Sequence, residues 1–130
     1  MFELTINSRV YQFNFGIGFL KDIDPTVTKP IDGIKGKVQN MGLQYAIGGV
    51  MDCNIIDIAD VLLRANKGFE PRLTQAEVEA FLESATTDIE ELSEKLLGFL
   101  KTANATKKAT LNLIEAVERE KAKEAAKENA

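Results

Sequence analysis

Residue types that usually carry enzymatic chemistry are scarce in this sequence. Histidine is absent, and Cys53 is the only cysteine. Ser-His and Cys-His hydrolases and the commonest zinc and iron sites need an imidazole, so the sequence excludes these designs. One cysteine cannot form an intramolecular disulfide, and its setting in the segment 50–53, Val-Met-Asp-Cys, favours a buried, packed thiol. We therefore expect no enzyme activity, no catalytic residues, no cofactor and no metal site.

Two glycine patterns resemble ligand-binding loops without their usual scaffolds. The segment 16–21, Gly-Ile-Gly-Phe-Leu-Lys, begins like a dinucleotide loop, but Lys21 stands where the third glycine belongs. The segment 33–37, Gly-Ile-Lys-Gly-Lys, has the GxxG spacing with which KH domains clamp a nucleic-acid backbone. A KH loop joins two helices, whereas prolines precede this segment, so we predict a flexible loop. A small RNA-binding module remains the weakest of three candidate functions.

Charge is unevenly distributed along the chain, although the net value is only −4. Residues 41–100 contain 4 basic and 11 acidic side chains, whereas residues 101–130 contain 7 basic and 5 acidic ones. An acidic middle disfavours nucleic acid as a partner. The asymmetry suits head-to-tail self-association, and solubility alone is an equally good explanation. No stretch approaches the roughly 18 apolar residues of a membrane span, so we expect a soluble protein without a membrane partner.

Alternating apolar residues predict a β-hairpin at the N-terminus. Phe2, Leu4 and Ile6 alternate with polar residues, and the same pattern returns at 11–15 after a polar interruption. A two-stranded hairpin is marginal in water, so helices or another copy of the chain must cover its apolar face. The length and apolar content of the whole chain favour one domain, which we place at residues 1–117 with the hairpin at 1–16. Residues 118–130 form a charged tail that should project or fray.

The rest of the chain has helical periodicity. We predict a short helix at 17–24, a long loop at 25–37, and a helix at 41–51 with one face of small residues. Asn54 can cap the next helix, and Thr74 and Thr87 each begin a capping-box pattern. A last helix should run from about residue 106 towards 127. The fold class is therefore mainly α with an N-terminal hairpin (α+β), with five to six helices in one small domain.

Two groups of residues are candidates for binding other proteins. Leu113, Ile114 and Val117 form the only bulky apolar cluster of the last helix, and they are our candidates for partner binding. Packing of this cluster against Leu96 and Leu100 is equally plausible. The candidates for self-association combine the small-residue helix face with two hairpin aromatics, for which core packing is the favoured alternative: Gly42, Ala46, Gly49, Tyr11 and Phe13.

Several segments of the sequence are similar to those of a known protein family. They are Phe2 to Asn7, Tyr11 to Leu20, Gly42 to Ile47, Asp60 to Leu63, Asn66 to Gly68, Pro71 to Thr74 and Asn104 to Lys107. Together they resemble the tail assembly chaperones of long-tailed phages (siphophages) that infect Gram-positive bacteria. The likeness covers most of the chain except the loop 25–37 and the tail after Val117.

This resemblance implies a function and a set of partners. Such a chaperone binds the tape measure protein, keeps it soluble and promotes assembly of tail tube protein around it. It also implies self-association, a longer form made by ribosomal frameshifting, and a place in the host bacterial cytoplasm rather than in the mature virion. The family offers no catalytic residues to carry over. The alternative function is a structural virion component, such as a tail completion or connector protein.

Overall fold

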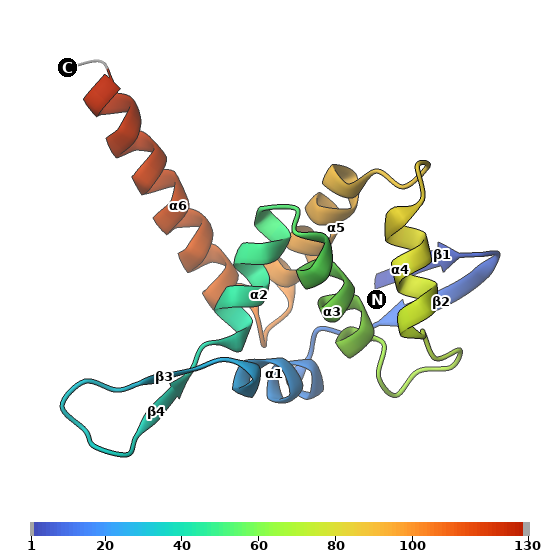
Figure 1. Cartoon of the computed structure of the whole chain (residues 1–130), viewed down its shortest axis with the longest axis horizontal. Coiled ribbons are helices and arrows are strands. Elements are labelled where there is room, and N and C mark those ends of the chain that lie inside the picture. Colours follow the sequence, from blue (N-terminus) through green and yellow to red (C-terminus); the bar gives the residue numbers. More distant parts are fainter. Residues whose placement is uncertain (1, 129–130) are drawn as a thin grey trace.

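The computed structural model describes residues 2–128 and has a hairpin followed by six α-helices (Figure 1). This architecture confirms the predicted α+β fold class. The elements in chain order are β1 (Phe2–Ile6), β2 (Arg9–Phe13), α1 (Ile17–Ile23), the 3-10 turn η1 (Asp24–Thr26), β3 (Thr28–Pro30), β4 (Val38–Asn40), α2 (Gly42–Met51), α3 (Ile55–Ala65), α4 (Gln75–Glu83), α5 (Ile89–Thr102) and α6 (Lys107–Glu128).

The N-terminal hairpin contributes aromatic side chains to the core. β1 and β2 pair antiparallel with Phe2 opposite Phe13, and the connecting residues Asn7 and Ser8 have φ values of 52° and 66°. Positive φ at both positions suits a turn whose twist matches the strands. The Phe2 ring packs edge to face against Phe13 at 5.5 Å and against Phe99 of α5 at 4.9 Å between centroids. Helices therefore cover the hairpin, as predicted.

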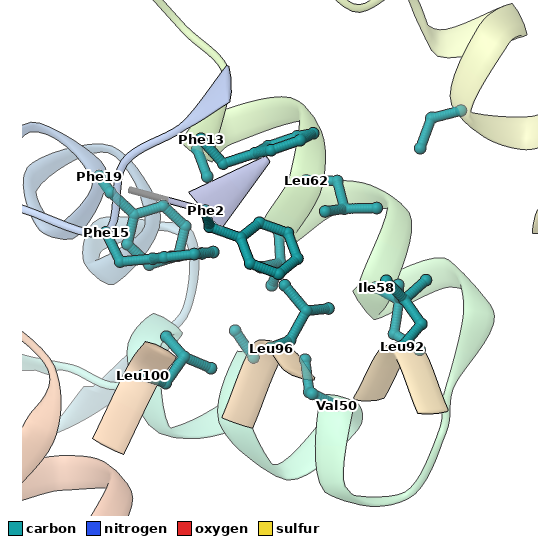
Figure 2. Close-up of a cluster of buried hydrophobic side chains, with 14 of the residues drawn as sticks. Phe2, Phe13, Phe15, Phe19, Val50, Ile58, Leu62, Leu92, Leu96 and Leu100 are labelled. Atoms are coloured by element: carbon teal, nitrogen blue, oxygen red, sulfur yellow. The ribbon is translucent and has the colours of Figure 1, made fainter. Parts of the chain in front are cut away.

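Three helices supply most of the aliphatic core (Figure 2). These helices are α2, α3 and α5, and their buried side chains form one cluster with the aromatic residues of the hairpin. The fully buried ones include Ile47, Val50, Ile58, Leu62, Leu96 and Leu100. Each buried side chain of this size contributes about 1.5–3 kcal/mol through removal of apolar surface from water. Most of the periodic positions that predicted these helices are buried, whereas Ile55 and Phe99 at the edges of the predicted faces are 45% and 38% exposed.

Helix starts were predicted correctly at two positions and wrongly at one. Asn54 Oδ1 accepts from the Asp57 amide at 3.2 Å, and Thr74 forms the predicted capping box with Glu77. Thr87 does not cap α5: Asp88 does, by accepting from the Glu91 amide at 3.1 Å. The Thr87 hydroxyl instead donates to the Phe81 carbonyl at 2.6 Å. A carboxylate directly next to the threonine takes the cap because it accepts amide hydrogen bonds strongly.

The predicted long loop at 25–37 is wrong in its detail. After η1, strands β3 and β4 form a second antiparallel hairpin, with Thr28 opposite Asn40 and Pro30 opposite Val38. We call residues 28–40 the arm. The Ile31 amide donates to the Lys37 carbonyl at 3.1 Å, which closes the tip. Gly33 and Gly36 have φ values of 79° and 80°, so the GxxG pattern serves the turn. The sequence did not predict these strands, because each has only three residues and β3 ends in a proline, so no alternation of apolar and polar residues is visible.

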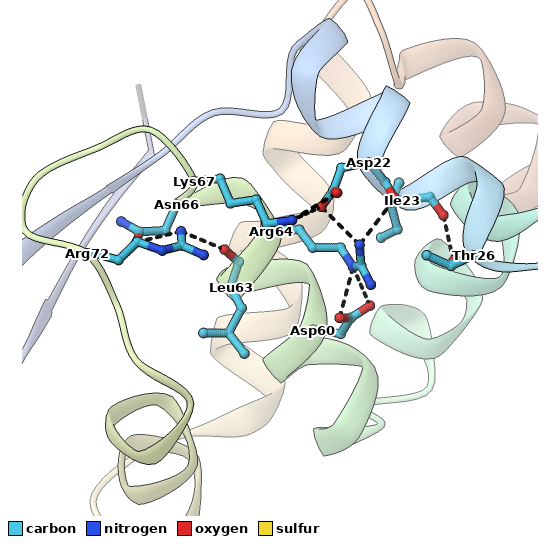
Figure 3. A network of polar contacts seen from close by, with 9 residues as sticks. All are labelled: Asp22, Ile23, Thr26, Asp60, Leu63, Arg64, Asn66, Lys67 and Arg72. Carbon is cyan, nitrogen blue, oxygen red and sulfur yellow. Dashed lines mark hydrogen bonds and ion pairs between the residues drawn. The ribbon is translucent and has the colours of Figure 1, made fainter.

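A polar network ties α1, α3 and the segment before α4 together (Figure 3). Arg64 pairs with Asp22 and with Asp60, each at 2.9 Å, and Lys67 pairs with Asp22 at 2.9 Å. Hydrogen bonds from Lys67 and Arg64 hold the pKa of Asp22 below its ordinary value. Asn66, at the end of α3, is fully buried and hydrogen-bonded on both sides of its amide. The network fixes where the hairpin and α4 meet α3.

The predicted boundary at residue 117, between the domain and the charged tail, falls within one continuous helix. α6 runs unbroken from Lys107 to Glu128, and every residue from 118 to 128 is exposed. The division at residue 117 remains a prediction. Among the helices of residues 2–128, none combines the length and apolarity that crossing a membrane requires.

Candidate partner-binding surfaces

α6 is anchored only at its N-terminal end. The hydroxyls of Thr106 and Thr110 donate to the Leu100 carbonyl at 2.7 and 3.3 Å, which joins the start of α6 to the end of α5. Thr110 is the only buried residue within the described length of the helix. Beyond Val117 the helix projects away from the body (Figure 1). An exposed helix of this composition is stabilised mainly by its own backbone and by ion pairs such as Lys123 with Glu120 at 3.7 Å.

The predicted partner-binding residues lie at the root of this helix. Leu113, Ile114 and Val117 are all half-buried, and Leu111 beside them is 50% exposed. Leu113 packs against the edge of the core and lies over Gly48 of α2. Leu113 is thus partly used for packing, while the cluster still presents apolar surface; partner binding through these three residues stays a prediction. We call Leu111, Leu113, Ile114 and Val117 the α6 root.

A shallow hollow of about 430 Å³ adjoins the α6 root. Tyr45, which is 63% exposed, and Leu113 line it from α2 and α6. Asp52 and Asp57 form an acidic wall of the same hollow. Desolvation, followed by the charges of Asp60 and Asp52, raises the pKa of Asp57. The hollow therefore offers apolar contact beside negative charge, which suits an amphipathic segment with basic residues.

A second and larger recess lies between α4, α5 and β1. Its volume is about 800 Å³, and we call it the α4–α5 groove. Leu4, Ile6, Phe81 and Leu92 are its apolar members, and the polar ones include Glu77, Asp88, Glu91 and Lys95. The Tyr11 hydroxyl donates to Glu77 Oε2 at 2.5 Å, and this bond, with those from Thr74, lowers the pKa of Glu77. The Glu77 carboxylate is therefore ionised at neutral pH, and Asp88 and Glu91 add two further acids to the lining of the groove.

Comparison with known protein families gives one match that covers most of the chain. A family model described as "Phage tail assembly chaperone protein, TAC" matches residues 3–115. The chain belongs to the phage tail assembly chaperone family. No curated protein matches it, and no solved structure does. The resemblance that the sequence phrases indicated is confirmed at the level of the family.

The segment matched by the family model includes some of the chaperone's candidate surfaces and leaves out others. Both hairpins, α1 to α5 and the first part of α6 fall inside the matched segment, including Leu113 and Ile114. Val117 and the projecting part of α6 lie beyond it. This family is not known for catalysis. Within residues 2–128, no three histidine, cysteine or acidic residues gather closely enough to hold a metal ion.

The five self-association candidates lie inside one copy of the chaperone. Tyr11 and Phe13 are 0% and 1% exposed, and the three small residues of α2 are also buried. A Cβ atom at Gly42 would overlap the Ile23 carbonyl oxygen, and one at Gly49 would overlap the Asp57 carboxylate. The small face of α2 therefore admits α1, η1 and α3 of the same chain. Self-association through these five residues stays a prediction, and their burial within one copy favours the alternative of core packing.

Sequence reasoning missed two surfaces of the chaperone and misjudged its cysteine. The α4–α5 groove joins residues from three elements, so no local pattern could indicate it, although Ala76 and Ala80 place small residues one turn apart on α4. The arm was read as a loop. Cys53, expected to be buried, is half-buried and has a φ of 56°, because it ends the α2 segment just before the Asn54 cap.

Proposed function

We propose that this chaperone binds the tape measure protein, keeps it soluble and promotes assembly of tail tube protein around it. The observation that carries the proposal is the α6 root, an apolar cluster left half-exposed where a 22-residue helix leaves the core. Family membership supplies the setting of tail assembly. The site of action is the host bacterial cytoplasm during infection, and the protein is absent from the mature virion.

Helix-on-helix contact explains how such a surface serves a long helical partner. An amphipathic helix is recognised through apolar anchors at three- and four-residue spacing. Ile114 and Val117 have this spacing, and Tyr45 adds an exposed ring beside Leu113. We assign partner binding to Leu113, Ile114 and Val117. Covering an apolar stripe of the partner removes the surface through which its own copies would aggregate.

Co-expression with the tape measure protein tests this assignment. The chaperone should raise the soluble recovery of that partner, and a double change of Ile114→Lys and Val117→Lys should abolish the gain. Two exposed alanines further along α6 provide matched controls, because Ala122→Lys and Ala125→Lys add the same charge to the projecting helix. If the partner's recovery were the same with and without the chaperone, the proposal would be wrong.

Further partners belong to the same proposal. Copies of the chaperone associate with one another and with a frameshift-extended form, and tail tube protein enters the complex after the tape measure protein. A structural virion component is the alternative function. Quantitative protein analysis of purified particles separates the two, because a virion component is present in fixed stoichiometry and a chaperone is lost.

A further inference from the structure

The arm is an exposed hairpin with apolar side chains that its own chain does not cover. Every residue from 28 to 40 is exposed, and Ile31, Ile34 and Val38 are 38%, 52% and 59% exposed. Backbone hydrogen bonds across the strands and the tip keep the arm formed. Three apolar side chains on one short element are more than isolated surface exposure accounts for, and such groups mark interaction sites.

The charge of the arm is opposite to that of the α4–α5 groove. Between residues 28 and 40 the arm has Lys29, Lys35 and Lys37 against the single acid Asp32. The groove has three acids, Glu77, Asp88 and Glu91, against Lys95. Both surfaces therefore pair apolar contacts with charge, and the signs are complementary. Complementary potentials of this kind favour the encounter and fix its orientation.

Their positions exclude contact within one copy. The arm lies at one end of the long axis of the molecule, and the groove between α4, α5 and β1 lies towards the other end (Figure 1). The volume of the groove, about 800 Å³, is within the roughly 300–1,000 Å³ of pockets that enclose compact ligands. The tip of a two-stranded hairpin is a compact insert with three apolar side chains. Each copy has one arm and one groove, so in an assembly of copies the groove of one can receive the arm tip of another.

We propose that the arm of one chaperone copy docks in the α4–α5 groove of the next copy. Ile34 then packs near Phe81, and Lys35 and Lys37 lie beside Asp88 and Glu91. Because two different surfaces meet, the contact is heterologous and generates a ring or an open filament of copies. Each copy in such an array presents its own α6 root. The inference supplies the surfaces for the proposed self-association and rests on that part of the proposed function.

Charge reversal with complementary mixing tests the contact. One variant carries Lys35→Glu and Lys37→Glu in the arm, and the other carries Glu91→Lys in the groove; all three positions are exposed. Sedimentation should show oligomers for the unmodified chain and monomers of 14.3 kDa for each variant alone. The mixture should associate again, because the intact arm of the groove variant meets the intact groove of the arm variant.

Matched variants control for charge alone. Lys121→Glu with Lys127→Glu reverses two lysines on the projecting part of α6, and Glu94→Lys reverses an exposed acid on α5 outside the groove. Both should sediment as the unmodified chain does. Filling the groove with Ala80→Trp should also give monomers, and circular dichroism should show that all variants remain helical. Ala80 is an exposed residue of α4, so the larger side chain is accommodated without disturbing the core.

Three results would overturn the inference. One is a monomeric unmodified chain at the highest soluble concentration. Another is association of either variant alone to the same extent as the unmodified chain, which would show that the contact between copies does not use the charges of the arm and the groove. The third is an unchanged oligomer when the arm is reversed, together with loss of binding to a single-stranded RNA oligonucleotide, which would assign the arm to RNA. Unchanged recovery of the tape measure protein by a monomeric variant would separate self-association from partner binding.

Discussion

The side-chain amide of Asn66 donates a hydrogen bond to the Gln12 carbonyl at 3.0 Å, joining the end of α3 to strand β2. The oxygen of the same amide accepts from the Leu73 amide at 2.6 Å, just before α4 begins. One buried side chain thus holds the hairpin, α3 and the approach to α4 in their relative positions. The groove that we assign to self-association depends on this arrangement, because β1 and α4 form two of its walls.

Replacing Asn66 by alanine should destabilise the chain by about 2–4 kcal/mol, because several backbone groups would lose their buried partner. Asn66 also accepts from the Arg72 guanidinium at 3.2 Å, so the loss extends to that side chain. Urea unfolding followed by circular dichroism measures the change. Asn112→Ala on the exposed side of α6 is the control and should cost only tenths of a kcal/mol. Equal effects at the two positions would contradict the role of Asn66.

Glycines 42 and 49 of α2 should respond differently to alanine. At Gly42 the new Cβ would overlap backbone oxygens of Ile23 and Asp24, which cannot rotate away, so we expect a loss of about 2–3 kcal/mol. At Gly49 it would overlap Asp57, whose carboxylate can turn towards the hollow but whose Cβ is held in place by the backbone of α3, so α3 must also shift. The gain in helix propensity, about 1 kcal/mol, offsets only part of that cost, so we expect a loss smaller than at Gly42. The midpoints of thermal unfolding should therefore rank unmodified, Gly49→Ala, Gly42→Ala; the reverse order of the two variants would contradict the argument.

Ser93 offers a stabilising substitution. It lies on α5, is 3% exposed, and its hydroxyl is the one buried side-chain polar atom among residues 2–128 without a hydrogen-bond partner. Ser93→Ala removes an unsatisfied hydroxyl and adds helix propensity, so the free energy of unfolding should rise by about 1 kcal/mol. Ser84→Ala is the contrasting case, because that hydroxyl contacts Thr86 at 2.9 Å. A destabilised Ser93→Ala variant would mean that the hydroxyl has a partner in solution.

The sequence predicted the helices well because their apolar residues repeat at the helical period and several have local caps. The helix expected at 41–51 is observed at 42–51, and the one expected to begin near 106 begins at 107. Asn54 and the Thr74 box act within three residues of themselves, so a local pattern suffices to find them. Two of the segments that resemble the chaperone family, those around Asn66 and Pro71, have a structural role, because both belong to the hydrogen-bond network of Asn66.

What the sequence could not predict depends on contacts between distant elements. The small face of α2 was visible as a pattern, but only the fold shows that α1, η1 and α3 occupy it. The sequence did not predict the strands of the arm, because they are three residues long and consist mostly of polar residues. The α4–α5 groove arises from three segments that are up to about 90 residues apart, so no periodicity within one of them indicates it.

Asp22 should make the chain more stable at neutral pH than in acid. Its pKa is lowered in the folded chain, first by Lys67 and then by Arg64, so its ionised form favours folding. This stability is present above the unfolded pKa of about 3.9 and is lost as the pH falls through the lower folded value. Asp22→Asn should therefore lower the unfolding midpoint at pH 7 and have little effect in strong acid. Solvent exposure of Lys67 keeps the effect modest.

Asp57 should show the opposite pH dependence. Desolvation and the charges of Asp60 and Asp52 raise its pKa in the folded chain, so its ionisation opposes folding. The cost is absent below the unfolded value of about 3.9, grows as the pH rises towards the folded value, and persists at neutral pH. Asp57→Asn keeps the shape of the side chain and should raise the unfolding midpoint at pH 7 but not at pH 3. Thermal melts at both pH values, with the exposed Glu83→Gln as control, decide the matter: a less stable Asp57→Asn at pH 7 would show that helix-dipole attraction in the first turn of α3 outweighs desolvation.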